Sequence, residues 1–191
     1  MASSSKYKYQ YKDREHSFKE SAGLVGILYG VNWIGYYITQ PDEVSNHGSF
    51  TKYRENFGEL QFDMDSAFWN LGVHPLVGGQ VFLFYRAHGY SHQSALFMTM
   101  IQSTLFEFTV EIYTEPASIQ DLYQTPILGS IVGYGLEQLS LKLLHNGTIW
   151  GKYLGHLINP WTLFPFFEEK VLITPRFDNG KMSGVSMMME F

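Results

Sequence analysis

Three acidic residues lie four positions apart in an otherwise apolar and aromatic stretch, at Glu107, Glu111 and Glu115. Residues four apart share one face of a helix, so this spacing places neighbouring carboxyl groups side by side. Carboxyl and imidazole groups transfer protons in hydrolysis and group transfer. We therefore name His74, Glu107 and Glu111 as candidate catalytic residues for a lipid-like substrate. A structural network in which nothing reacts is the interpretation that we prefer at this point.

Glu107 and Glu111 together with His74 could also bind a metal ion. Di-iron bundles carry Glu-x-x-His pairs and zinc proteases carry HExxH, and neither pattern occurs at these positions. Phosphate loops and the Gly-x-Ser-x-Gly motif are also absent. The sequence has no cysteine, which excludes thiolate ligands. We therefore assign no metal ligand and no cofactor.

Small and polar residues precede the acids in steps of four. A second predicted helix repeats the pattern with two glycines followed by an acid. The first series is Ser91, Ala95, Thr99, Ser103, Glu107 and Glu111, and the second is Gly129, Gly133 and Glu137.

These stripes have two interpretations. A soluble amphipathic helix turns its charges outward, which leaves Gly129 and Gly133 unexplained. In the opposite arrangement the small residues pack together, the acids point into the bundle and the apolar remainder faces lipid. We prefer the second arrangement because it also accounts for the many aromatic residues.

Carboxylates that point inward need a partner, because an unpaired buried charge is very costly. Arg86 is the only lysine or arginine between Arg54 and Lys142. We expect it to pair with at least one of three acids, which are Glu107, Glu111 and Glu137. The predicted structural polar network consists of Arg86, Glu137, Ser103 and Asp121, with Asp121 in a helix cap.

The elements that position these residues are mainly helical. An uncharged segment, 21–39, is long enough for a membrane helix. Capping residues and prolines predict the other helix boundaries. We expect a break at His74-Pro75, followed by a helix from Pro75 to Gly89 and another from Ser91 to about Glu115. A further helix should begin at Thr125-Pro126 and end at Asn146-Gly147, and the last one should end before Pro160.

Both ends of the chain have a strand pattern. Residues 6–12 alternate Tyr with Lys or Gln, and the tail has a hairpin signal at 178–180. We therefore predict a mainly α, membrane-type helical bundle in one domain of 191 residues. Its parts are an N-terminal arm or strand (1–20), the helical bundle (21–167) and a C-terminal β-hairpin (168–191).

The composition limits the partners. The net charge of −5 argues against nucleic-acid binding. Aromatic residues make up 17% of the chain and charged residues 16%, which suits a surface that meets lipid. The mean hydropathy of −0.11 is low for an inner-membrane protein with several spans. Alternate apolar residues before Phe191 are typical of the last strand of outer-membrane proteins, so we favour the outer membrane.

Two stretches, "HPLVGGQVFLFYRAHGYSHQSA" and "STLFEFTVEIYTEPASIQDLYQTPILGSIVGYGLEQ", resemble the bacterial family called domain of unknown function 3943. The resemblance covers about residues 66–165, and Ala117 departs from it where a second proline is expected. It implies a bacterial cell-envelope protein and no established activity. The matching positions are His74-Pro75, Arg86, Gly89-Tyr90-Ser91, Glu107, Glu111, Pro116, Ser118, Asp121, Thr125-Pro126, Gly129 and Glu137.

We therefore expect a non-enzymatic subunit or scaffold of the bacterial cell envelope. Its expected partners are membrane lipid and other envelope proteins or a second copy of the chain. The alternative is a lipid-active hydrolase or transferase that uses the Glu/His cluster. The two differ in one observable: whether the carboxylates meet at an accessible cavity or are all neutralised by Arg86 and backbone donors.

Overall fold

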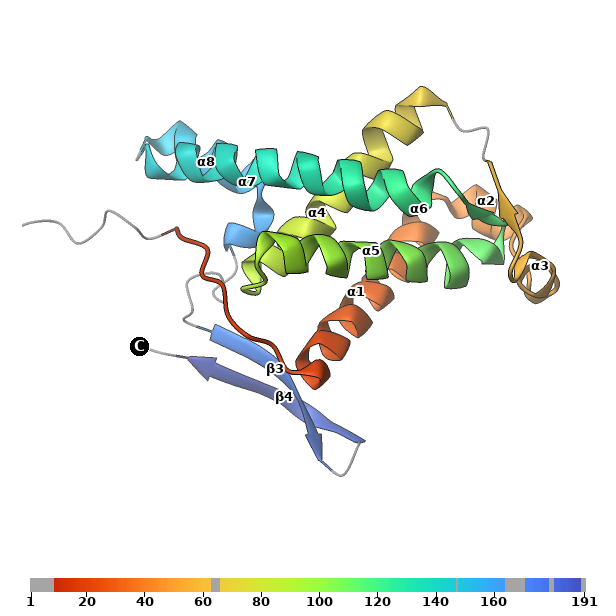
Figure 1. The fold of residues 1–191 in the computed structure, drawn as a ribbon, viewed down its shortest axis with the longest axis horizontal. Helices are drawn as coiled ribbons and strands as arrows, with labels where there is room; N and C mark the ends of the chain where they lie inside the picture. The colour runs from red at the N-terminus through yellow and green to blue at the C-terminus, as the bar shows by residue number, and fades with distance from the viewer. Residues whose placement is uncertain (1–8, 63–65, 147, 164–170, 179–180, 190–191) are drawn as a thin grey trace, which may run out of the picture.

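A bundle of helices forms the body of the protein, and a β-hairpin follows it in the chain (Figure 1). The computed structural model describes residues 9–62, 66–146, 148–163, 171–178 and 181–189, the last two ranges by their backbone alone. The long elements are α1 (Phe18–Thr39), α4 (His74–Ala87), α5 (His92–Thr109), α7 (Gly129–His145), α8 (Ile149–Ile158), β3 (Val171–Asp178) and β4 (Lys181–Met189). The short ones are α2 (Pro41–Asn46), α3 (Phe50–Asn56), α6 (Asp121–Tyr123), β1 (Leu60–Gln61) and β2 (Ala117–Ser118).

Several helix ends lie where the capping residues predict them. The Ser91 hydroxyl accepts a hydrogen bond from the Ser94 N–H at 3.2 Å and begins α5. Gly89, with a φ of +89°, ends the preceding helix in a left-handed conformation. Asn146 caps α7. The mainly helical fold class is confirmed.

The predicted break at His74-Pro75 is wrong. A π-helical turn, η1 (Trp69–Val73), runs directly into α4, and the His74 N–H bonds to the Trp69 carbonyl. α4 itself begins at His74, so the predicted position of Pro75 in the first turn of this helix is confirmed. Pro126 lies in a second π-helical turn, η3 (Gln124–Leu128), which leads into α7 in the same way.

The helix predicted to reach Glu115 ends earlier. α5 stops at Thr109, and a 3-10 turn, η2 (Glu111–Tyr113), follows. Residues two apart lie on opposite sides of an α-helix, yet Val110 and Ile112 are both fully buried. The tighter turn brings both side chains inward and leaves Glu111 buried between them.

Glycines bring α4 and α7 into backbone contact. A Cβ atom added at Gly129 would lie 2.7 Å from the Cα of Gly78, and one at Gly133 would lie 2.9 Å from the Gly79 carbonyl oxygen. Such contacts leave no room for any side chain. The glycines of α7 therefore pack against glycines of α4, whereas we predicted that they would pack against the small residues of the α5 stripe.

The acids at the ends of the stripes are inside the bundle. Glu107 and Glu137 are each 2% exposed, whereas Phe97 on α5 is 62% exposed and Ile131 on α7 is 65% exposed. This is the arrangement with buried acids and outward apolar side chains that we preferred from the sequence. Among the residues that the structure describes, no helix has both the length and the apolar character needed to cross a membrane.

The strand prediction is confirmed at the C-terminal end of the chain but not at the N-terminal end. The predicted C-terminal hairpin is confirmed: β3 and β4 are antiparallel, with Val171 paired to Met189, and lie near the start of α1 (Figure 1). Its turn at 179–180 lies outside the described residues, as do residues 1–8. Residues 9–12 form no strand. The segment 9–16, called the arm below, instead places its side chains against the bundle, and its Arg14 N–H bonds to the Gly89 carbonyl at 2.8 Å.

Candidate functional site

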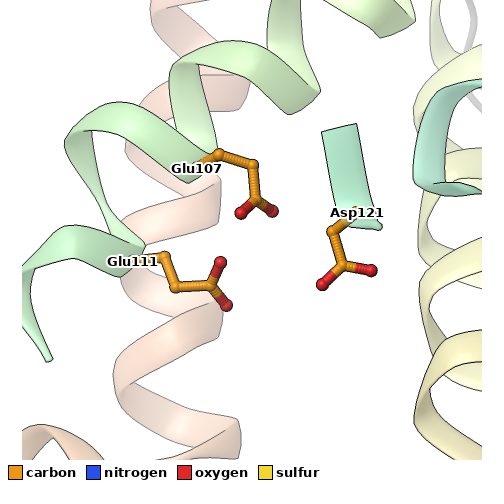
Figure 2. A group of neighbouring side chains, drawn as sticks. All are labelled: Glu107, Glu111 and Asp121. Carbon is orange, nitrogen blue, oxygen red and sulfur yellow. The ribbon is translucent and has the colours of Figure 1, made fainter. Parts of the chain in front are cut away.

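Three buried carboxyl groups meet at one place in the bundle. Oxygen atoms of Glu107, Glu111 and Asp121 all lie within 4.8 Å of one another. Glu107 comes from the last turns of α5, Glu111 from the 3-10 turn and Asp121 from the start of α6. Figure 2 shows the three side chains pointing toward a common space. We call these three residues the acid cluster.

After Pro116 the chain runs back toward α5, and a short parallel pairing of strands holds this segment in place. β2 pairs with β1, and the Ile119 N–H bonds to the Gln61 carbonyl at 2.9 Å. The Ser118 N–H then donates to Glu107 at 2.9 Å. This pairing explains how Asp121 reaches the two glutamates.

Ser118 and Ser103 fix the backbone of Asp121. The Ser118 hydroxyl accepts from the Asp121 N–H at 3.2 Å, and the Ser103 hydroxyl donates to the Asp121 carbonyl at 3.2 Å. The hydrogen bond from the Asp121 N–H to the Ser118 hydroxyl is the one expected of "SIQD". The residue at the cap position of α6 is nevertheless Gln120, which makes no side-chain capping bond. Asp121 also contributes its carboxylate to the acid cluster, a role that we did not predict.

Burial and mutual repulsion make the ionised forms of the glutamates unfavourable. The pKa of Glu107 is raised to about 7, mainly by burial and to a smaller extent by the charges of Asp121 and Glu115, while hydrogen bonds from Glu111 and the Ser118 N–H act in the opposite direction. Burial also raises the pKa of Glu111 well above its usual range, and the charge of Glu107 adds to this effect. A hydrogen bond between the two carboxyl groups requires one of them to hold a proton, and it raises the pKa of Glu111.

His74 lies at the edge of the acid cluster. Its Nδ1 atom is 3.7 Å from an Asp121 carboxylate oxygen. The imidazole ring of His74 therefore lies beside the acid cluster.

The acid cluster borders a cavity of about 300 Å³ between α1, α4 and α5. Glu107, Glu111 and His74 are all among its lining residues. About half of the other lining side chains are apolar or aromatic, and they include Val31, Val77, Val81 and Phe106. The cavity therefore combines an apolar wall with one strongly polar end.

A buried amide also faces this cavity. Gln102 is 1% exposed, and its Oε1 accepts a hydrogen bond from the Tyr85 hydroxyl at 3.4 Å. Its Nε2 has no hydrogen-bond partner within the described protein, and neither has the hydroxyl of Thr125, another lining residue. The cavity thus offers hydrogen-bond donors as well as carboxyl groups.

Arg86 belongs to a second polar group. Its Nε and Nη2 atoms donate to the two carboxylate oxygens of Glu137 at 2.9 and 3.2 Å, and Nη1 donates to Asp13 at 2.7 Å. The Tyr90 carbonyl accepts another of its hydrogen bonds, and the Tyr11 ring lies 4.8 Å below the guanidinium. The expected pairing of Arg86 with a stripe acid is confirmed for Glu137.

The predicted polar network is therefore two groups. Ser103 and Asp121, which we expected beside Arg86, lie with Glu107 and Glu111 instead. The physical reason is that the donors of Arg86 are already taken by Glu137, Asp13 and a carbonyl.

Sequence reasoning missed Tyr11, Asp13 and Gln102. Tyr11 and Asp13 belong to a polar segment with no helical period, and Gln102 is one neutral residue in an apolar helix. No pattern in the sequence distinguishes these three from surface residues.

Comparison with known proteins identifies the family. The sequence profile described as "Domain of unknown function (DUF3943)" matches residues 59–161, more than half of the chain. No curated protein and no solved structure matches the chain. The matched range contains the acid cluster, His74, Arg86 and Glu137. The chain therefore belongs to the DUF3943 family, as its motifs indicated.

Proposed function

We propose that this protein binds an amphipathic, lipid-like molecule at a bacterial envelope membrane and cleaves it or transfers its polar group. Glu107, Glu111 and His74 are the reacting groups. The observation that supports the proposal is that these side chains line a cavity, while Arg86 is paired with Glu137. That is the outcome expected of the enzyme rather than of the scaffold.

The cavity suits a molecule with one apolar and one polar part. The valines and Phe106 would hold an acyl chain or another apolar group, and the acid cluster would hold the polar end. In hydrolysis a base takes a proton from the attacking water and an acid gives one to the leaving group. His74 is placed for the first role and the glutamate pair for the second.

The outer surface supports a location at a membrane. α8 exposes Ile149, Trp150, Tyr153, Leu154 and Leu157. These positions follow the period of one helix face, and Gly151 and Gly155 on the other face pack against α7. An apolar face with Trp and Tyr is typical of a helix that lies in the membrane interface. We place the protein in the cell envelope, at the outer membrane rather than the inner.

The experiment compares glutamine variants of matched acids. Purified full-length protein is incubated with lipids extracted from bacterial envelopes, and the products are followed by mass spectrometry. Glu107→Gln and Glu111→Gln keep the shape of each side chain but remove the acid, so each should abolish turnover. Glu15→Gln alters an exposed acid of the arm that does not act on the two glutamates, and it should leave turnover unchanged. Equal turnover in all three variants would contradict the proposal.

A non-enzymatic subunit or scaffold is the second candidate, and the exposed apolar residues of several helices support it. Its partners would be membrane lipid and other envelope proteins or a second copy of the chain. Under this function, Glu107→Gln and Glu111→Gln should complement a deletion strain as long as protein abundance is unchanged. A null phenotype with a folded, abundant variant supports the enzyme.

A further inference from the structure

We propose that the acid cluster binds one divalent metal ion, with Glu107, Glu111 and Asp121 as ligands and His74 beside them. The inference rests on the proposed function for the place of the site, which is the polar end of the same cavity. With an ion bound, the two glutamates would be ionised ligands, and His74 alone would take up and return the proton in the proposed reaction. It adds a cofactor that the sequence did not indicate. Three steps support it: the spacing of the carboxylates, the charge around them and an unpaired carboxylate oxygen.

The spacing of the carboxylates fits a shared ion. One oxygen atom from each of the three residues lies within 4.8 Å of the other two. Metal–oxygen bonds in proteins are about 2.0 to 2.6 Å long, so two ligands on opposite sides of an ion are roughly 4 to 5 Å apart. The three side chains also point toward one space from three different segments (Figure 2).

The charge around the acid cluster favours a cation. The charged groups that act on Glu107 and Glu111 are each other, Asp121 and Glu115, and all are acidic. Arg86, the one arginine or lysine between Arg54 and Lys142, is engaged with Glu137 and Asp13. Buried carboxylates need a compensating charge, and a divalent ion provides it for two of the three.

An independent observation points to a ligand at this place. Glu111 is 8% exposed and lines the cavity, and its Oε2 atom has no hydrogen-bond partner within the described part of the chain. A buried carboxylate oxygen without a donor is costly. A metal ion that enters through the cavity would contact this oxygen directly.

The donor set selects the class of ion. Carboxylates suit Mg²⁺, Ca²⁺ and Mn²⁺, whereas imidazole suits Zn²⁺ and Fe²⁺. Three carboxylates with one imidazole nearby therefore favour Mn²⁺, Fe²⁺ or Zn²⁺ over Mg²⁺. Mn²⁺ is the practical probe because its free form gives a paramagnetic resonance signal.

The experiment titrates chelator-treated, full-length protein with MnCl₂ and follows free Mn²⁺ by electron paramagnetic resonance. One ion should bind per chain. Glu111→Gln and Asp121→Asn should each weaken binding by about tenfold or more, because each removes a charged ligand. Glu15→Gln removes an exposed acid of the arm that does not act on the acid cluster, and it should bind like the parent protein. The melting temperature should rise with Mn²⁺ in the parent and less in the two ligand variants.

Two results would overturn the inference. The first is no bound Mn²⁺ or Zn²⁺ at about millimolar concentration, and the second is equal binding by the parent protein, Glu111→Gln and Asp121→Asn. The ligand variants remain informative if their circular dichroism spectra match that of the parent. Lipid turnover together with no metal binding would overturn the metal site but support the proposed enzyme. Metal binding without lipid turnover would support the metal site but contradict the proposed enzymatic function.

Discussion

Arg86 and Glu137 form a two-pronged ion pair inside the bundle, with N–O distances of 2.9 and 3.2 Å. The two side chains are 4% and 3% exposed. His92 adds a further contact to Glu137, at 3.1 Å. This pair neutralises the charge of Glu137, the acid at the end of the α7 stripe. Arg86 therefore does not neutralise the acid cluster.

Replacement of Arg86 should destabilise the protein strongly. Arg86→Ala leaves the Glu137 carboxylate buried without its counter-ion, which costs about 3–5 kcal/mol in the free energy of unfolding. Arg86→Lys should recover only part of this loss, because an ammonium group cannot reproduce the planar fork. Urea denaturation measures both values. Arg54→Ala removes an exposed arginine and should change the value by less than about 0.5 kcal/mol. An unchanged midpoint for Arg86→Ala would place Arg86 outside the core.

Two glycines of α7 should respond in opposite directions to the same substitution. Gly129→Ala inserts a methyl group 2.7 Å from the backbone of Gly78, so it should destabilise by about 1–3 kcal/mol. Gly135→Ala meets no atom within 4 Å and should stabilise the helix by about 0.5–1 kcal/mol. Thermal unfolding of both variants measures the two changes in stability. Equal effects would show that α4 and α7 are not in backbone contact.

Buried His88 should make the protein less stable in acid. The pKa of His88 is lowered to about 4, mainly by burial and to a smaller extent by the charges of Arg14 and His16. The hydrogen bond to the Phe84 carbonyl and the charge of Glu20 act in the opposite direction. The unfolded chain binds this proton near pH 6.5, so stability is complete above that pH and falls as the pH drops from 6.5 toward 4.

The test of His88 compares the pH dependence of two variants. His88→Asn keeps a donor near the Phe84 carbonyl but cannot take up a proton, so its free energy of unfolding should fall less steeply between pH 7 and about pH 5 than that of the parent. His145→Asn removes an exposed histidine as the control. Identical slopes for His88→Asn and the parent would refute the role of His88.

The exposed face of α8 should hold the protein to membranes. The parent protein should sediment with membranes and resist extraction by salt and carbonate. The double variant Trp150→Ser with Leu157→Ser removes side chains that are 74% and 77% exposed, and a larger fraction of it should be extracted. Gln138→Ser alters an exposed polar residue of α7 and should behave like the parent. Recovery of the parent as a monodisperse monomer without detergent would end the membrane proposal.

Local rules were enough to predict much of the helical framework. Ser91 and Gly89 carry their own capping chemistry, so the start of α5 and the end of α4 could be read from single residues. The step-of-four stripes were equally informative, because Gly129 and Gly133 have no other reason to precede Glu137 on one face. Burial of the stripe acids followed from this pattern.

The acid cluster could be predicted only in part, because it depends on contacts between distant segments. The approach of Asp121 requires the pairing of β1 with β2, and these strands have two residues each. The end of α5 at Thr109 depends on the burial of Val110 and Ile112, which outweighs the helical preference of the sequence there. Asp13 reaches Arg86 across 73 residues of chain.

The arm also determines the order in which this protein can fold. Tyr9 accepts a hydrogen bond from His145, and Tyr11 accepts one from Asn159. At a synthesis rate of about 5–20 residues per second, roughly 7 to 30 s pass between the emergence of Tyr11 and that of Asn159. The arm leaves the ribosome before all of these helices but has nothing complete to dock against until α8 has followed. The earliest described segment thus completes its contacts only after α8 has been made, so its docking is a late step in folding.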